Sequence, residues 1–378
     1  MSRAAVLAKD GKIYRAPFGE SKVLRIDPEN GKVEKVGPDL GCGGYKFQTA
    51  VLVKDGTIYC PPVSAARVLR IDPKSGAVEQ VGPDLGSGEN KFWSPVLGKD
   101  GRIYCPPRGA SKVLRIDPES CTVEHVGSDL GSRRFKFGAA VLGMDGIIYC
   151  PPVYASRVLR IDPENSMVEQ VGPDLGAGGY KFQAAVLVED GTIYCPPVCA
   201  SRVLRIVPKS GVVEQVGPDL GSGEYKFWAA VLARDGNVYC PPRGASKVLR
   251  IDPESGIVEQ IGPDLGSAEN KYKAAVLAKD GRIYCPPSGA SKVLRIDPKT
   301  CAVEQIGPDF GLGSFKFGAA LLGKDGRIYC PPDSVSRLLR IDPGSGVVEQ
   351  IGPDLNSEEK IGAAFLGWKN VLPNYESF

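Results

Sequence analysis

Asp55-Gly56-Thr57-Ile58-Tyr59-Cys60-Pro61-Pro62 is the stretch that decides the fold, because the chain repeats its pattern at a constant interval. After the tyrosine only the first copy differs, since it has Arg15-Ala16-Pro17 in place of Cys-Pro-Pro. A fixed period of this length is typical of solenoids, propellers and other repeat arrays. The tyrosine returns every 45 residues, at Tyr14, Tyr59, Tyr104, Tyr149, Tyr194, Tyr239, Tyr284 and Tyr329.

Each repeat unit contains four short strands and two tight turns, which residues 46–90 illustrate. Asp55-Gly56 is a strong signal for a tight turn, and Pro61-Pro62 ends the second strand because proline cannot donate to a strand ladder. Asp72-Pro73-Lys74-Ser75-Gly76 is a second turn, since proline presets φ and glycine permits positive φ. No segment is long enough for a helix. The strands are expected at residues 46–53, 58–60, 67–71 and 77–81.

The repeat predicts an all-β fold, a closed eight-bladed β-propeller with four antiparallel strands in each 45-residue blade. Residues 1–366 are expected to form the propeller. Within them, residues 360–366 repeat the first strand of a ninth unit and are expected to help close the ring. Residues 367–378 would form a C-terminal tail.

The third and fourth strands of each unit carry a recurring pair of opposite charges. Folding the hairpin about its Asp-Pro turn places the arginine directly opposite the glutamate. Such a cross-strand pair contributes ~0.2–1 kcal/mol, so it sets the register and is not read as a site. The pairs are Arg25–Glu34, Arg70–Glu79, Arg115–Glu124, Arg160–Glu169, Arg205–Glu214, Arg250–Glu259, Arg295–Glu304 and Arg340–Glu349.

A longer period lies on top of the 45-residue repeat. Residues 87–93, with Trp93 at their end, return as residues 222–228, with Trp228 at theirs. The spacing equals three units, so units one to three are interpreted as copied into units four to six.

Composition excludes several classes of function. The 47 basic and 44 acidic residues leave a net charge of +3, which is too balanced for a general nucleic-acid or membrane surface. No apolar run reaches the ~18 residues of a membrane helix. Because Met1-Ser2-Arg3 leads directly into repeat sequence, no export signal is expected, and the protein is predicted to be cytoplasmic and monomeric.

Eleven cysteines without an export signal are interpreted as free thiols in a reducing compartment. Seven of them occupy one repeat position, which favours a shared packing role over a reactive one. They are predicted to be buried and reduced: Cys60, Cys105, Cys150, Cys195, Cys240, Cys285 and Cys330.

The repeated motif D-G-x-I-Y … V-L-x-I-D-P-x-x-G-x-V resembles the blades of the streptogramin-lyase, SMP-30 and NHL-type propeller group. The lyase-like branch of that group uses a histidine base with a metal. This chain has a single histidine, His125, at a fourth-strand position where most other units have glutamine, so it is read as an outer-edge substitution. No catalytic residue, metal or cofactor is therefore expected, and the repeated aspartates are explained by their turns.

By strand alternation, the connections after the second and fourth strands emerge together, on what we call the long-loop face. The connection from the fourth strand of one unit to the first strand of the next, which we call the crossing loop, contains a lysine flanked by aromatic residues. One hypothesis is a basic ring at a channel mouth that concentrates anions or an acidic partner. The alternative pairs each lysine with a nearby carboxylate such as Asp39 or Asp84. The candidate residues are Lys46, Lys91, Lys136, Lys181, Lys226, Lys271, Lys316, Lys360, Tyr45, Trp93, Tyr180, Tyr225 and Trp228.

The leading functional hypothesis is a non-enzymatic scaffold that binds a protein or peptide through the long-loop face. The first alternative is a multivalent glycan-binding propeller, because repeated pockets with tyrosine or tryptophan can stack on sugars. The second is an enzyme of the lactonase or lyase type. Neither nucleic acid nor membrane is expected as a partner.

Overall fold

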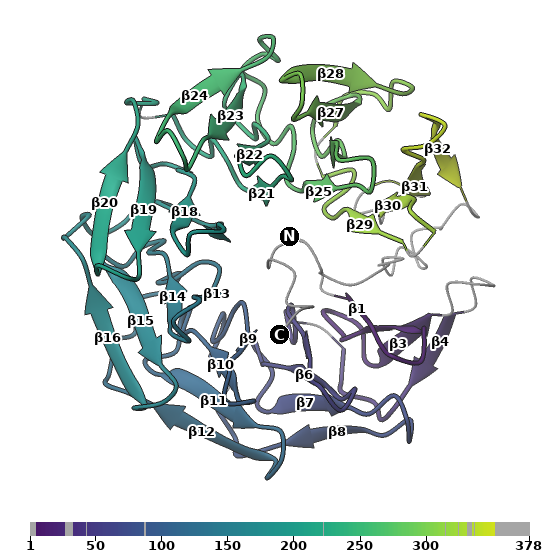
Figure 1. Cartoon of the computed structure of the whole chain (residues 1–378). Helices are drawn as coiled ribbons and strands as arrows, with labels where there is room; N and C mark the ends of the chain where they lie inside the picture. Colours follow the sequence, from purple (N-terminus) through teal and green to yellow (C-terminus); the bar gives the residue numbers. More distant parts are fainter. Residues whose placement is uncertain are drawn as a thin grey trace. The chain divides into compact units, whose positions relative to one another are not determined.

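The computed structural model describes residues 5–26, 33–42, 44–86, 88–221, 223–313, 315–323, 325–330, 335 and 337–351. The chain divides into two compact units, Ser2–Gly178 and Gly179–Phe378 together with Met1 (Figure 1). We call these the N-terminal and C-terminal units and describe each by itself.

The N-terminal unit contains four antiparallel sheets, each with its four strands in sequence order. The strands are β1 (Ala5–Leu7), β2 (Ile13–Arg15), β3 (Val23–Ile26), β4 (Val33–Val36), β5 (Val51–Leu52), β6 (Ile58–Cys60), β7 (Val68–Ile71), β8 (Val78–Val81), β9 (Val96–Leu97), β10 (Ile103–Cys105), β11 (Val113–Asp117), β12 (Thr122–Val126), β13 (Val141–Leu142), β14 (Ile148–Cys150), β15 (Val158–Asp162) and β16 (Met167–Val171).

The C-terminal unit contains four further sheets of the same order. Their strands are β17 (Val186–Leu187), β18 (Ile193–Cys195), β19 (Val203–Val207), β20 (Val212–Val216), β21 (Val231–Leu232), β22 (Val238–Cys240), β23 (Val248–Ile251), β24 (Val258–Ile261), β25 (Val276–Leu277), β26 (Ile283–Cys285), β27 (Val293–Asp297), β28 (Ala302–Ile306), β29 (Leu321–Leu322), β30 (Ile328–Cys330), β31 (Leu338–Ile341) and β32 (Val348–Ile351).

The predicted fold class is confirmed: the described residues form eight four-stranded antiparallel propeller blades and no helix. The first strands of consecutive blades contact each other, as β9 does β13 and β21 does β25. The strand expected to close the ring, residues 360–366, and the tail, residues 367–378, lie outside the described residues.

The first strand of each blade is shorter than the sequence predicts. In the second blade it covers only Val51–Leu52, and Phe47 forms a separate bridge with Pro62. The ladder breaks beside Pro61-Pro62 because proline has no N–H to donate.

The predicted hairpin register is confirmed in all eight blades. Arg115 lies opposite Glu124 in the β11–β12 pair, and their side chains form an ion pair at 2.7 Å. The equivalent ion pairs are Arg25–Glu34, Arg70–Glu79, Arg160–Glu169, Arg205–Glu214, Arg250–Glu259, Arg295–Glu304 and Arg340–Glu349.

The recurring tyrosine closes the turn before its own strand. The hydroxyl of Tyr104 donates to Asp100 Oδ2 at 2.9 Å, while Oδ1 of the same aspartate accepts from the backbone N–H of Arg102. Burial is the main reason why the pKa of Tyr104 rises to about 12. Tyr59 differs, because Thr57 uses Asp55 Oδ2 and the Tyr59 hydroxyl reaches Pro118 O at 3.5 Å instead.

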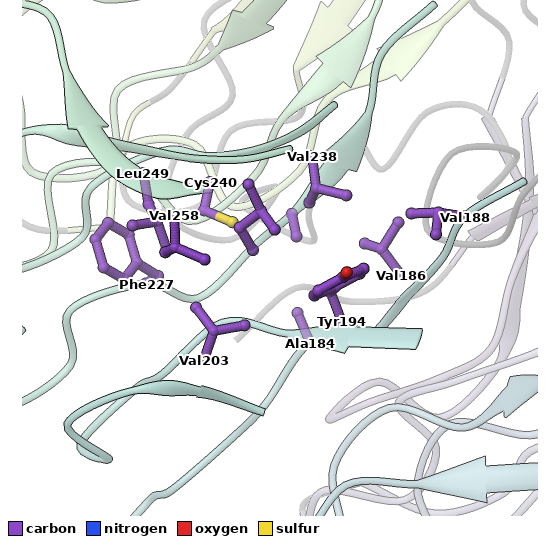
Figure 2. Close-up of a cluster of buried hydrophobic side chains, with 12 residues drawn as sticks. Ala184, Val186, Val188, Tyr194, Val203, Phe227, Val238, Cys240, Leu249 and Val258 are labelled. Atoms are coloured by element: carbon purple, nitrogen blue, oxygen red, sulfur yellow. The ribbon is translucent and has the colours of Figure 1, made fainter. Parts of the chain in front are cut away.

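The hydrophobic core lies between consecutive blades. One cluster joins Tyr194 and Val186 of one blade to Phe227, Cys240 and Leu249 of the next (Figure 2). Within each unit, consecutive blades therefore cover each other's apolar faces, and the tyrosine that marks the repeat belongs to that contact. The same pattern recurs around Tyr59, Tyr104, Tyr239 and Tyr284.

At six junctions within the two units, the glycine after the fourth strand lies tightly against the next blade. Gly262 has φ +76°, and a Cβ added to it would lie 2.6 Å from Cβ of Val303 on β28. That separation is well inside van der Waals contact, so only a residue without a side chain fits. The equivalent contacts are Gly37–Val78, Gly82–Val123, Gly127–Val168, Gly217–Val258 and Gly307–Val348.

The predicted burial of the seven repeat cysteines is confirmed. All seven are reduced thiols with no exposed surface, and burial raises the pKa of the Cys240 thiol far above its usual value. Cys42 and Cys121, by contrast, are exposed.

Iodoacetamide added to the native protein is expected to modify Cys42 and Cys121 and to spare the seven repeat cysteines, because the reactive thiolate does not form in a buried apolar site. Mass spectrometry of proteolytic fragments measures the modified positions. The same reaction in guanidinium chloride is the control and should label all eleven. Rapid native labelling at the repeat position would contradict the assigned packing role.

Candidate binding site on the long-loop face

The long loops of neighbouring blades are joined through their backbones. The residue after Cys-Pro-Pro donates to the lysine of its own blade and accepts from the lysine of the next. Arg108 N donates to Lys91 O at 2.9 Å, and Lys136 N donates to Arg108 O at 3.0 Å. In the C-terminal unit Arg243 stands in the same way between Lys226 and Lys271. This ladder fixes the side chain after Cys-Pro-Pro at the junction of two blades.

The crossing lysines are buried beneath these loops. Lys91 Nζ donates to Gly86 O at 2.8 Å and to Gly88 O at 3.0 Å, both in its own loop, and among the described residues it forms no ion pair with Asp84. Burial lowers the pKa of Lys91 to about 8. Two backbone carbonyls likewise accept from the ammonium groups of Lys136, Lys226, Lys271 and Lys316.

These contacts give the lysines a role in holding the crossing loops. Lys46 and Lys181 are buried as well, while Lys360 lies outside the described residues. Anion binding at the lysine positions stays a prediction. The geometry places the ammonium groups against backbone carbonyls, an arrangement that the sequence hypotheses did not include.

The aromatic candidates divide between two arginine-centred clusters, with Tyr45 apart from both. Tyr45 is half-exposed and meets Phe18 edge to face at 4.6 Å. Trp93 belongs to the first cluster, and Tyr180, Tyr225 and Trp228 belong to the second.

The Arg108 cluster lies in the N-terminal unit and contains Trp93, Arg108, Phe135 and Tyr154. The guanidinium of Arg108 lies 4.0 Å from the ring centroid of Trp93 and 4.6 Å from that of Phe135. Phe135 comes from the loop that leads into the next blade, and its ring lies 6.0 Å from that of Tyr154. Arg108 is only 6% exposed, so this cluster is closed.

The Arg243 cluster lies in the C-terminal unit and contains Tyr180, Tyr225, Trp228, Arg243 and Asn270. The Arg243 guanidinium lies 4.4 Å from the Tyr225 ring and 4.3 Å from the Trp228 ring. Its Nε and Nη2 donate to Asn270 Oδ1 at 3.0 and 2.7 Å. The Tyr180 ring lies 5.8 Å from Tyr225 and 6.2 Å from Trp228. Arg243 remains partly exposed, unlike Arg108.

Two rings of these clusters are held by an unusual backbone. Phe135 has φ 58° and Tyr225 has φ 54°, in the left-handed region that bulky residues seldom adopt. Such a conformation costs about 1–3 kcal/mol and persists only where the surroundings impose it. Gly244 restrains the Tyr225 loop, because a Cβ at this glycine would lie 2.7 Å from Glu224 O. The backbone at Phe135 is held by Tyr154, whose N–H donates to Phe135 O at 3.0 Å.

The candidate residues predicted from the sequence include the two tryptophans but not the two arginines. The signal was present: arginine follows Cys-Pro-Pro at Arg108 and Arg243, in the two blades that have tryptophan at positions 93 and 228. Each arginine stands 15 residues after its tryptophan, and the clusters are separated by the three-unit period.

The described residues hold no group of three or more side chains suited to a metal ion. His125 is exposed on β12 with its ring 6.1 Å from that of Phe92, as expected for an outer-edge position. No described helix could cross a membrane.

Comparison with known proteins gives one partial family match. A family model described as a repeat of unknown function, DUF6923, matches residues 243–372. No curated protein matches the sequence.

Solved structures of similar fold include two lyases and a dehydrogenase. A streptogramin B lyase shares 14% identity at a TM-score of 0.54, covering 75% of this chain and 90% of that chain. Virginiamycin B lyase from Staphylococcus aureus shares 16% at 0.53, covering 74% and 89%. The dihydro-heme d1 dehydrogenase NirN shares 12% at 0.65, covering 90% and 72%. The resemblance to streptogramin-lyase propellers is confirmed in the fold, and identities this low establish the fold alone.

Proposed function

We propose that the protein is a non-enzymatic scaffold that binds a peptide segment of a protein partner through its long-loop face. The observation that carries this proposal is the pair of aromatic–arginine clusters, one on the long loops of each unit. Tryptophan, tyrosine and arginine dominate the energetics of protein interfaces, because each combines a large contact area with directional polar groups.

The loops that carry the clusters are held in place by hydrogen bonds, which favours a binding role for these side chains. Backbone hydrogen bonds join neighbouring loops, and buried lysines hold the loop carbonyls. Side chains held in place before binding lose less conformational entropy when a partner arrives. Further apolar side chains are exposed on the equivalent connections of other blades, namely Tyr45, Leu312 and Phe315.

Panning of a random peptide phage library against the immobilised full chain tests the proposal. We expect enriched peptides whose binding weakens about tenfold or more in Tyr180→Ala/Trp228→Ala, since interface hot spots are worth at least ~1.4–2 kcal/mol. The control variant Lys74→Ala/Lys299→Ala changes exposed residues of the Asp-Pro turns, on the opposite face. It should stay within about twofold of the wild type. Thermal unfolding of each variant verifies that its fold is intact.

Three outcomes would contradict the proposal. Peptides that bind both variants equally would place recognition elsewhere. A glycan array with several sugars bound to each chain, and no enriched peptide, would favour the glycan-binding alternative. Metal-dependent turnover of a lactone or a streptogramin would favour the enzyme alternative.

A further inference from the structure

We propose that Arg243 pairs with a carboxylate of the bound peptide, so that the partner segment carries an acidic residue beside an apolar or aromatic one. This inference rests on the proposed function and specifies the chemistry that the Arg243 cluster recognises.

The first observation is the incomplete set of partners around Arg243. A guanidinium has five N–H donors. Nε and Nη2 donate to Asn270 Oδ1, Nη1 has no acceptor, and no carboxylate among the described residues lies within 4 Å of the group. Arginines of the strand hairpins, such as Arg250 and Arg295, each have their glutamate. Nη1 itself is closed to solvent, so a ligand carboxylate would reach Arg243 at the exposed part of its side chain and there offset the cost of a shielded cation without a counter-ion.

The second observation is that the group is held in one orientation. Tyr225 and Trp228 contact the guanidinium through their ring faces, and Asn270 accepts from two of its nitrogens. A planar guanidinium fixed in this way matches the two oxygens of a carboxylate. The neighbouring Tyr180 ring offers an apolar surface for the residue next to the acid.

The third observation is the contrast with Arg108. The two arginines occupy equivalent positions three units apart, but Phe135 covers Arg108 where Asn270 contacts Arg243. Arg108 is almost fully buried, whereas Arg243 is partly exposed. Arg108 is therefore the closed counterpart of Arg243.

Two exposed acidic residues near the Arg243 cluster favour a carboxylate ligand over a phosphate. Glu269 interacts electrostatically with Arg243 without forming an ion pair, and Glu224 precedes Tyr225. Their negative charges disfavour a doubly charged phosphate more than a singly charged carboxylate. In the N-terminal unit, Arg134 stands at the position of Glu269 and pairs with Glu89 at 3.4 Å.

The test uses two peptides, acetyl-Gly-Tyr-Glu-Tyr-Gly-amide and the same peptide with Gln in place of Glu. The full chain carries Trp93→Phe and Trp368→Phe, which leaves Trp228 as its one tryptophan and as the fluorescent reporter. We expect the Glu peptide to bind about tenfold more tightly than the Gln peptide, as a charge-assisted hydrogen bond predicts. Arg243→Gln should abolish this difference. Lys299→Gln, at an exposed lysine of an Asp-Pro turn, should keep it, and Glu269→Gln should increase it by removing a competing charge.

Each other result overturns the inference. Equal binding of the two peptides would show that the site does not recognise a carboxylate, while leaving peptide binding itself intact. A preference for the Glu peptide that survives Arg243→Gln would assign the charge contact to another residue. Failure of both peptides, with binding of polygalacturonate, would overturn the inference and the proposed function together. Displacement of the Glu peptide by phosphate at concentrations where acetate has no effect would assign the site to phosphate.

Discussion

Gly262→Ala is expected to lower the free energy of unfolding by about 3 kcal/mol, whereas Gly266→Ala lowers it by only about 1 kcal/mol. Both glycines have φ +76°, so both substitutions place an L-residue in the left-handed region. They differ in their surroundings: the Cβ of an alanine at 262 would lie 2.6 Å from Val303, and nothing lies within 4 Å of the equivalent position at 266. The difference between the two variants therefore isolates the steric contact between blades.

Urea denaturation monitored by circular dichroism measures both losses. Gly307→Ala and Gly311→Ala repeat the comparison one blade later, where Val348 is the residue equivalent to Val303. Equal losses in the two members of a pair would show that backbone strain alone sets the cost, and that the outer strands do not pack as described.

Lys91→Met is expected to lower the free energy of unfolding by about 2 kcal/mol, because it leaves Gly86 O and Gly88 O without their shared donor. The loss of two hydrogen bonds outweighs the gain from no longer burying a charge. Lys271→Met should behave in the same way at Gly266 and Ala268.

Lys74→Met is the matched control, since Lys74 is an exposed lysine of an Asp-Pro turn and its loss should change stability little. Differential scanning calorimetry measures all three variants. If Lys91→Met unfolded at the wild-type temperature and lost binding of a polyanion such as polyglutamate, the lysines would be a binding site and not a support for the loops.

The fold was accessible from the sequence because its determinants are local and repeated. Turn residues, the proline stops and the Arg25–Glu34 type of pair lie within one blade, so the 45-residue period and the strand alternation predict the register. The buried cysteines followed from the same reasoning. A local pattern repeated eight times leaves few alternative arrangements.

The lysine environment was not accessible in the same way. Lysine is rarely buried, and aspartates such as Asp84 lie nearby in the sequence, which favoured an exposed or ion-paired side chain. The burial of Lys91 depends on how its loop folds back, so that two carbonyls three and five residues earlier in the chain converge on one ammonium group. Spacing along the chain does not reveal that curvature.

The arginine clusters depend on contacts between blades. Phe135 lies 27 residues after Arg108, and Asn270 lies 27 residues after Arg243, each in the loop of the next blade. The same holds for Gly262 and Val303, which meet only when neighbouring outer strands pack. Single-blade reasoning predicts which residues stand on the long loops, but not which of them meet across the junction.

Cores that lie between blades have a consequence for synthesis on the ribosome. A blade that has emerged, with Tyr194 on its face, keeps that face uncovered until Phe227, Leu249 and their neighbours arrive. At about 5–20 residues per second, the wait for one 45-residue blade lasts roughly 2–9 s. Growing intermediates within a unit thus end in similar uncovered apolar faces, and nascent chains on one messenger present these faces at the same time. Slow translation is therefore expected to promote pairing between chains, and a stall at a blade boundary gives the longest exposure.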